Sequence, residues 1–152
     1  MTREVGPVPR SLLAFWQVVG GVDLRGSHPA WARTASLDLT GAEEGPGVWL
    51  TDPLCVARPD ALLEETLDEA VEGTPYALCI APDLYGKAGY SGGTLSVWTP
   101  VDADDAPVEG AQRRETLVEH LRRALRWGGF PGFEFIEDRP EEWLAAAIAS
   151  AI

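Results

Sequence analysis

The stretch IAPDLYGKAGYSGGTLSVWTP, residues 80–100, decides the expected fold of this chain. The mostly apolar run 76–81 leads into it and has the length of a central strand. The β-branched and aromatic run 94–99 predicts a second strand. Four glycines between residues 84 and 93 favour a tight loop that connects two neighbouring strands.

The second informative stretch is ETLVEHLRRALRWGGFPGF, residues 115–133. Its leucines recur every four residues, which predicts an amphipathic helix over 113–127. Gly128-Gly129 is expected to end this helix, and Pro131 prevents its continuation. Glu119 precedes Arg123 by four residues, the favoured order for an ion pair on a helix.

Other segments complete the expected set of elements. Pro9 opens a predicted helix that ends at Gly20-Gly21, and further helices are expected at 60–71 and 140–149. Short strands are expected at 31–39, 48–50, 54–56 and 133–136. The apolar stripes predict that six side chains are buried against a sheet that contains 76–81 and 94–99, namely Leu12, Phe15, Trp16, Leu117, Leu121 and Leu125.

These elements indicate an α+β fold: a mainly antiparallel sheet with three to four helices packed against it, in one domain over residues 1–152. The chain has 24 acidic and 12 basic residues, a net charge of −12. Such a field repels nucleic acids and anionic membranes and attracts a basic partner. An acidic surface that only maintains solubility is the alternative.

Compartment signals favour the cytoplasm. Cys55 and Cys79 lie in apolar runs, which indicates reduced, buried thiols, with a disulfide between neighbouring strands as the alternative. No cysteine or histidine spacing indicates zinc. The N-terminal residues lack the apolar core of a signal peptide, and no apolar run approaches about 18 residues, the length that crosses a membrane.

The search for catalytic or cofactor motifs finds none. His28 and His120 have no nucleophile elbow or other local signature beside them. The loop 83–93 has the residue types of a phosphate loop in the wrong order, since Lys87 precedes the later glycines. The acidic run from Asp102 fails the calcium-loop pattern, because Pro107 and Arg113 stand where glycine and glutamate are required. We expect the whole segment 100–110 to be a solvated acidic loop. We therefore expect a protein without catalytic residues, metal or cofactor.

Basic residues concentrate around the helix predicted at 113–127. We expect these arginines to pair with carboxylates of the same chain rather than to bind nucleic acid. They are Arg113, Arg114, Arg122, Arg123 and Arg126.

Several motifs, in their order along the chain, resemble the SUKH superfamily, also called SMI1/KNR4-like. They are PRSLLAFWQVVGGVDL (9–24), DPLCV (52–56), IAPDLYGKAGYSGG (80–93) and ETLVEHLRRALRWGGFPGF (115–133). In particular, Pro9, Phe15 and Gly20-Gly21 match the Pro-led aromatic helix with which members begin. The resemblance covers about two thirds of the chain and leaves 25–47 unmatched.

The resemblance implies an α+β binding module rather than an enzyme, and many bacterial members resemble immunity proteins that neutralise a toxin, often a nuclease. We therefore expect a protein partner with a basic surface. The alternatives are a small-ligand or enzymatic domain that uses loop 83–93, and a structural subunit of a larger assembly. Binding is expected through loop carboxylates or exposed tryptophans, and the candidates are Asp102, Asp104, Asp105, Glu109, Trp31, Trp49 and Trp98.

Overall fold

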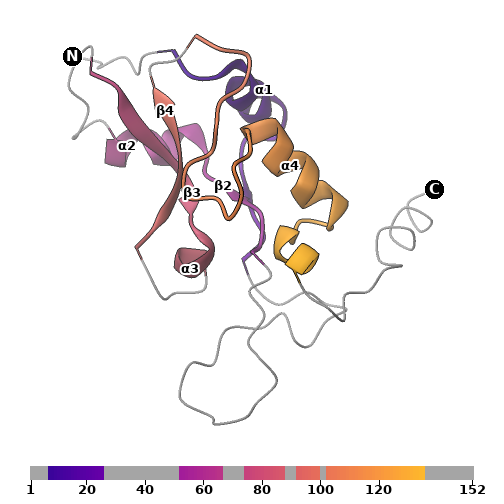
Figure 1. Ribbon diagram of the computed structural model, residues 1–152. Helices are drawn as coiled ribbons and strands as arrows, with labels where there is room; N and C mark the ends of the chain where they lie inside the picture. Colours follow the sequence, from indigo (N-terminus) through magenta and orange to yellow (C-terminus); the bar gives the residue numbers. More distant parts are fainter. Residues whose placement is uncertain (1–6, 26–51, 67–73, 88–91, 100–101, 136–152) are drawn as a thin grey trace.

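The computed structural model describes residues 7–25, 52–66, 74–87, 92–99 and 102–135 (Figure 1). The strands predicted at 31–39 and 48–50 and the helix predicted at 140–149 lie outside these ranges, as does His28. Within them the chain is a mixed α+β structure with small antiparallel sheets and four α-helices.

The predicted central strands are confirmed. β3 (Tyr76–Pro82) and β4 (Thr94–Thr99) pair antiparallel from Tyr76 opposite Thr99 to Pro82 opposite Thr94, with an irregularity between Cys79 and Ala81. The inward-facing side chains of the pair are almost completely buried and form the centre of the core; they are Leu78, Ile80, Leu95 and Val97.

Part of the segment predicted as a solvated acidic loop, 100–110, continues the sheet instead, over residues 106–109. Ser96 and Glu109 exchange two backbone hydrogen bonds, N to O 3.1 and 2.9 Å, and Pro107 bridges to Thr116. Alternation explains the difference, because Ala106 and Val108 are buried while Pro107 and Glu109 are exposed. Burying two apolar side chains in this way outweighs the polar character of the neighbouring aspartates.

A second strand pair lies beside the first. β1 (Val22–Asp23) pairs antiparallel with β2 (Cys55–Val56), the strand predicted at 54–56. The Ala57 amide donates to the Ile80 carbonyl at 2.7 Å, which joins β2 to β3.

Three predicted helices are confirmed. α1 (Arg10–Val18) and α4 (Leu117–Arg126) have shorter bounds than predicted, and α2 (Pro59–Thr66) reaches the end of its described range. In Figure 1, α1 and α4 lie side by side. Leu12 of α1 and Leu117 of α4 belong to the same core as the buried side chains of β3 and β4. The end of α4 is a Schellman motif, since the Gly129 amide donates to Ala124 and the Gly128 amide to Leu125. Both glycines have positive φ, as predicted for this terminus.

Two local predictions were wrong. Residues 84–87 are not loop but a short helix, α3 (Leu84–Lys87), because the Asp83 carboxylate accepts from the Gly86 amide at 2.6 Å and caps its start. The strand predicted at 133–136 is a 3-10 helix, η2 (Pro131–Phe135). There Phe133 donates to the Phe130 carbonyl, and the two rings pack with centroids 5.8 Å apart.

The predicted core is right except at its end. Leu12 and Leu117 are fully buried, and Phe15, Trp16 and Leu121 pack partly buried against the core. Leu125 is 68% exposed, which contradicts its prediction. The buried face of α4 is rotated towards His120, Arg123 and Ala124. Counting only apolar residues misplaces this face, because two of its members are polar.

These two leucines of one helix make a matched test of the core. Leu117→Ala should lower the free energy of unfolding by about 2–5 kcal/mol, because it leaves a cavity where no solvent enters. Leu125→Ala should change it by less than about 0.5 kcal/mol. Urea denaturation of both variants measures the difference, and equal losses would contradict the assignment of the buried face.

Candidate functional site

The solvent-facing side of the extended sheet carries the most exposed tryptophan described. Trp98 stands opposite Ala77 on β3 and is 52% exposed. Because Ser96 pairs with Glu109, the residue opposite Trp98 on the other side is Pro107. We call this surface the Trp98 face: Ala77, Cys79, Trp98, Pro107 and Glu109, together with Ser96, which is buried between Cys79 and Glu109.

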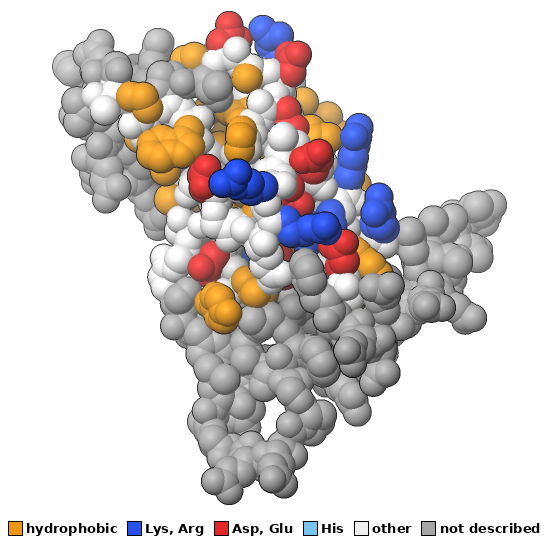
Figure 2. All heavy atoms as spheres, viewed as in Figure 1, with side chains coloured by type: hydrophobic (Ala, Val, Ile, Leu, Met, Phe, Trp, Pro, Cys, Tyr) orange, Lys and Arg blue, Asp and Glu red, His pale blue; other side chains and the backbone are white. Residues whose placement is uncertain are grey.

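Cys79 and Ser96, which are paired across β3 and β4, form the small, polar part of the Trp98 face. The Ser96 hydroxyl donates to the Cys79 sulfur at 3.6 Å and shares a 3.2 Å hydrogen bond with the Thr94 hydroxyl. Ala77, Trp98 and Pro107 form the apolar part of this face. In the view of Figure 2, apolar side chains lie next to acidic and basic side chains on the surface of the described residues.

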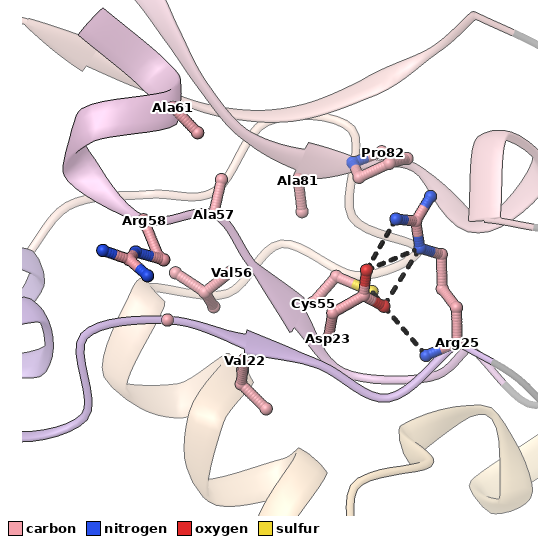
Figure 3. Close-up of a pocket in the computed structure, with 11 residues that line it drawn as sticks. Val22, Asp23, Arg25, Cys55, Val56, Ala57, Arg58, Ala61, Ala81 and Pro82 are labelled. Carbon is pink, nitrogen blue, oxygen red and sulfur yellow. Dashed lines mark hydrogen bonds and ion pairs between the residues drawn. The ribbon is translucent and has the colours of Figure 1, made fainter.

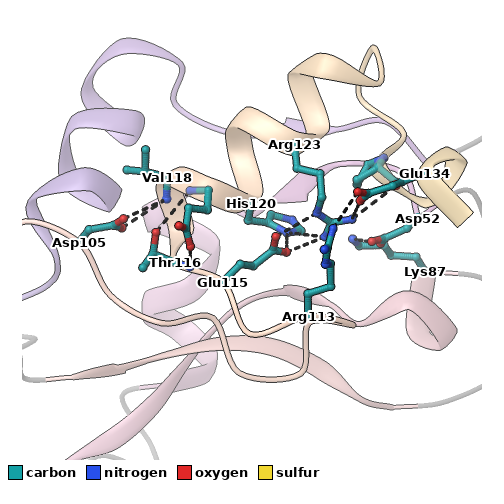
Figure 4. Close-up of polar contacts among 12 residues, drawn as sticks. Asp52, Lys87, Asp105, Arg113, Glu115, Thr116, Val118, His120, Arg123 and Glu134 are labelled. Atoms are coloured by element: carbon teal, nitrogen blue, oxygen red, sulfur yellow. Dashed lines mark hydrogen bonds and ion pairs between the residues drawn. The ribbon is translucent and has the colours of Figure 1, made fainter. Parts of the chain in front are cut away.

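The acidic residues of 102–105, predicted to bind a partner, contact the first turns of α1 and α4. The Asp105 carboxylate accepts from the Ser11 hydroxyl at 2.9 Å and from the Val118 amide at 3.3 Å (Figure 4). Asp102 and Asp104 form exposed ion pairs with Arg10, at 3.2 and 2.8 Å. The loop therefore fastens the start of α1 to the start of α4.

All four amides that α4 leaves without a helical partner are satisfied. Leu117 donates to the Ala106 carbonyl and Val118 to Asp105. Thr116 and Glu119 form a capping box, in which each side chain accepts from the other residue's amide. Glu119 is thus used at the cap, and its predicted ion pair with Arg123 is wrong.

The Asp105 carboxyl is ionised by its surroundings. Partial burial raises the pKa of this carboxyl. Hydrogen bonds from Thr116, Ser11 and the backbone amides of Ala106 and Val118 lower it by more, so the net pKa lies below its ordinary value. A negative carboxylate at two helix N-termini is also favoured by both helix dipoles.

A buried ionic network joins Glu115, which precedes α4, to His120 and Arg123 of that helix (Figure 4). Glu115 accepts from Arg123 Nη2 at 2.6 Å and is 2.7 Å from His120 Nδ1. Burial raises the pKa of Glu115, but hydrogen bonds from His120 and Arg123 and the Arg123 charge outweigh it and lower the pKa to about 2. His120 Nε2 is buried and has no hydrogen-bond partner among the described residues.

A second buried pair adjoins this network. Lys87 Nζ is 2.6 Å from an oxygen of Asp52, and both side chains are at most 6% exposed. Lys87 is the cation that the alternative nucleotide or enzyme interpretation of loop 83–93 would place at a ligand. Here it is enclosed and neutralised by a carboxylate.

The expected pairing of the arginines is confirmed in part. Arg113 pairs with Glu134 at 2.7 Å, and Arg123 pairs with Glu115. Within the described ranges, Arg114, Arg122 and Arg126 make no ion pair.

A shallow hollow of about 390 Å³ lies between β1, β2 and α2 (Figure 3). Its floor is apolar, and its polar groups are committed: Arg25 binds Asp23 at 2.6 Å, and burial raises the pKa of the Cys55 thiol to about 11. The Arg58 side chain lies over Gly21, and both residues also line a neighbouring hollow of about 520 Å³ beside Trp16. The paired groups leave an apolar surface with little to orient a ligand.

The structure therefore divides the predicted site residues. Trp98 and Glu109 share one surface. Asp105 caps α4, Asp102 and Asp104 pair with Arg10, and Trp31 and Trp49 lie outside the described residues. Ala77 and Pro107 were missed, although the alternation in Ala106–Glu109 was a signal for an added strand. Cys55 and Cys79 are both free.

Among the described residues no cluster of metal-ligating side chains occurs, and no described helix is long and apolar enough to cross a bilayer. Comparison with protein-family models, curated proteins and solved structures finds no match for the chain.

The buried network predicts a pH-dependent loss of stability. Glu115→Gln should cost about 3–5 kcal/mol at pH 7, because it leaves the buried Arg123 charge without its partner. The lowered pKa of Glu115 stabilises the fold above the ordinary value of 4.5, and this contribution is lost as pH falls towards about 2. The difference between wild type and variant should therefore shrink over that interval.

Denaturant unfolding at a series of pH values measures this difference. The exposed Glu109→Gln is the matched control and should stay within about 0.5 kcal/mol of wild type at neutral pH. A Glu115→Gln deficit that is small at pH 7, or that stays constant down to pH 2, would overturn the role of the network.

Proposed function

We propose that this chain is a non-enzymatic protein-binding module that contacts its partner through the Trp98 face. The observation that supports the proposal is the position of Trp98, a half-exposed aromatic side chain at the centre of a sheet surface. Tryptophan is enriched among the residues that dominate binding energy at protein interfaces.

The underside of the sheet supports this role. The neighbours of Trp98 along β4, Val97 and Thr99, are fully buried, and Val97 belongs to the main core. The strand that presents Trp98 is therefore held in place before a partner arrives. Binding to such a surface loses little conformational entropy, which favours affinity.

Charge supports a basic partner. With 24 acidic and 12 basic residues, the chain would accelerate its association with a positively charged protein. We propose that it is a cytoplasmic immunity or accessory protein that neutralises a basic toxin such as a nuclease. The SUKH-like motifs support the same proposal, and membership of that superfamily is part of it.

A photo-crosslinking residue tests the proposal directly. Replacing Trp98 by p-benzoylphenylalanine should produce a discrete crosslink to one protein in the source cells, because the face lies within the interface. The same residue at Leu125, which is exposed on α4 away from this face, is the control. Equal crosslinking from both positions, or none from position 98, would contradict binding through the Trp98 face.

A further inference from the structure

Trp98 and Glu109 lie at diagonal positions on one side of the sheet. Ser96 is directly opposite Glu109, and Trp98 is two residues further along the same strand. Diagonal neighbours in antiparallel sheets have Cα atoms about 7–8 Å apart, within reach of long side chains. An indole face and a carboxylate can therefore contact one ligand group between them.

The Glu109 carboxylate is available for such a group. Within the described residues it forms no ion pair and no side-chain hydrogen bond, in contrast to Asp102, Asp104 and Asp105. Arg114 is close in sequence, but no ion pair joins it to Glu109. The Glu109 backbone is fixed by its two hydrogen bonds to Ser96, so the side chain starts from a defined position on the sheet.

An aromatic face beside a free carboxylate is complementary to a guanidinium group. Arginine stacks on an indole through its planar cation and donates hydrogen bonds to a carboxylate from its edge. Lysine offers a compact, strongly hydrated charge and cannot do both with one planar group. Ala77 and Pro107 flank Trp98 on either side and would contact apolar atoms next to the arginine.

From this geometry we infer that the Trp98 face recognises an arginine side chain of the partner protein, stacked on Trp98 and paired with Glu109. The inference rests on the proposed function and gives the partner its chemistry. It is also consistent with the basic partner that the net charge favours.

A capped Leu-Arg-Leu tripeptide is the probe, added to uniformly ¹⁵N-labelled full-length protein and followed by NMR. The Trp98 indole N–H and the Glu109 amide should shift in a saturable manner. Matched peptides with lysine or with citrulline, the neutral isostere of arginine, should bind at least about threefold more weakly.

Variants locate the effect. Trp98→Ala and Glu109→Gln should each weaken binding of the arginine peptide by about threefold to tenfold. Leu125→Ala and Asp104→Asn are controls that alter an exposed apolar residue and an exposed acid elsewhere, and they should leave binding unchanged. Retained spectra of the variants would show that they are folded.

The outcomes separate this inference from the proposed function. The arginine inference would be overturned if the three peptides bound equally, or if the control variants weakened binding as much as Trp98→Ala and Glu109→Gln. In that case a crosslink from position 98 would still support the proposed protein-binding function. Arginine-selective shifts without any crosslink would support the chemistry of the face and contradict its use in a protein complex.

Discussion

The described fold depends on one carboxylate, that of Asp105. Its oxygens accept from the Ser11 hydroxyl in α1 and from the Val118 amide in α4, two residues more than a hundred positions apart in sequence. The carbonyls of Ala103 and Asp104 accept from the first amides of α1 in the same loop. Both helices therefore start at one acidic segment, where the negative charge also favours their dipoles.

The segment that follows Asp105 connects this joint to the Trp98 face. Ala106 and Val108 face the core, and Pro107 and Glu109 face outwards. At Gly110 the backbone has a φ of +82°, and an added Cβ would collide with the Thr94 carbonyl, so only glycine allows the return towards Glu115. Glu115 then enters the buried network with Arg123. The same few residues thus hold α4, complete the sheet and place Glu109 beside Trp98.

The sequence predicted the parts of this arrangement that have a local signal. Run length and apolar or β-prone composition identified β3 and β4, and the glycine pair identified the end of α4. Long-range polar contacts left no such signal: the acidic run 102–105 resembles any solvated loop until Ser11 and Arg10 are placed beside it. For the same reason Leu125 was expected inside, because the burial of His120 and Arg123 depends on Glu115. Of the Trp98 face, only Trp98 and Glu109 were predicted, because Ala77 and Pro107 are placed beside Trp98 by the strand register, which has no local signal in the sequence.

Paired variants of the acidic loop test most directly whether Asp105 joins the two helices. Hydrogen exchange and denaturant unfolding of Asp105→Ala should show a loss of about 1–3 kcal/mol and faster exchange at both the Ser11 and Val118 amides. Asp104→Ala removes an exposed ion pair from the same loop and should stay within about 0.5 kcal/mol of wild type. Equal losses in the two variants, or faster exchange at only one helix in Asp105→Ala, would contradict the account.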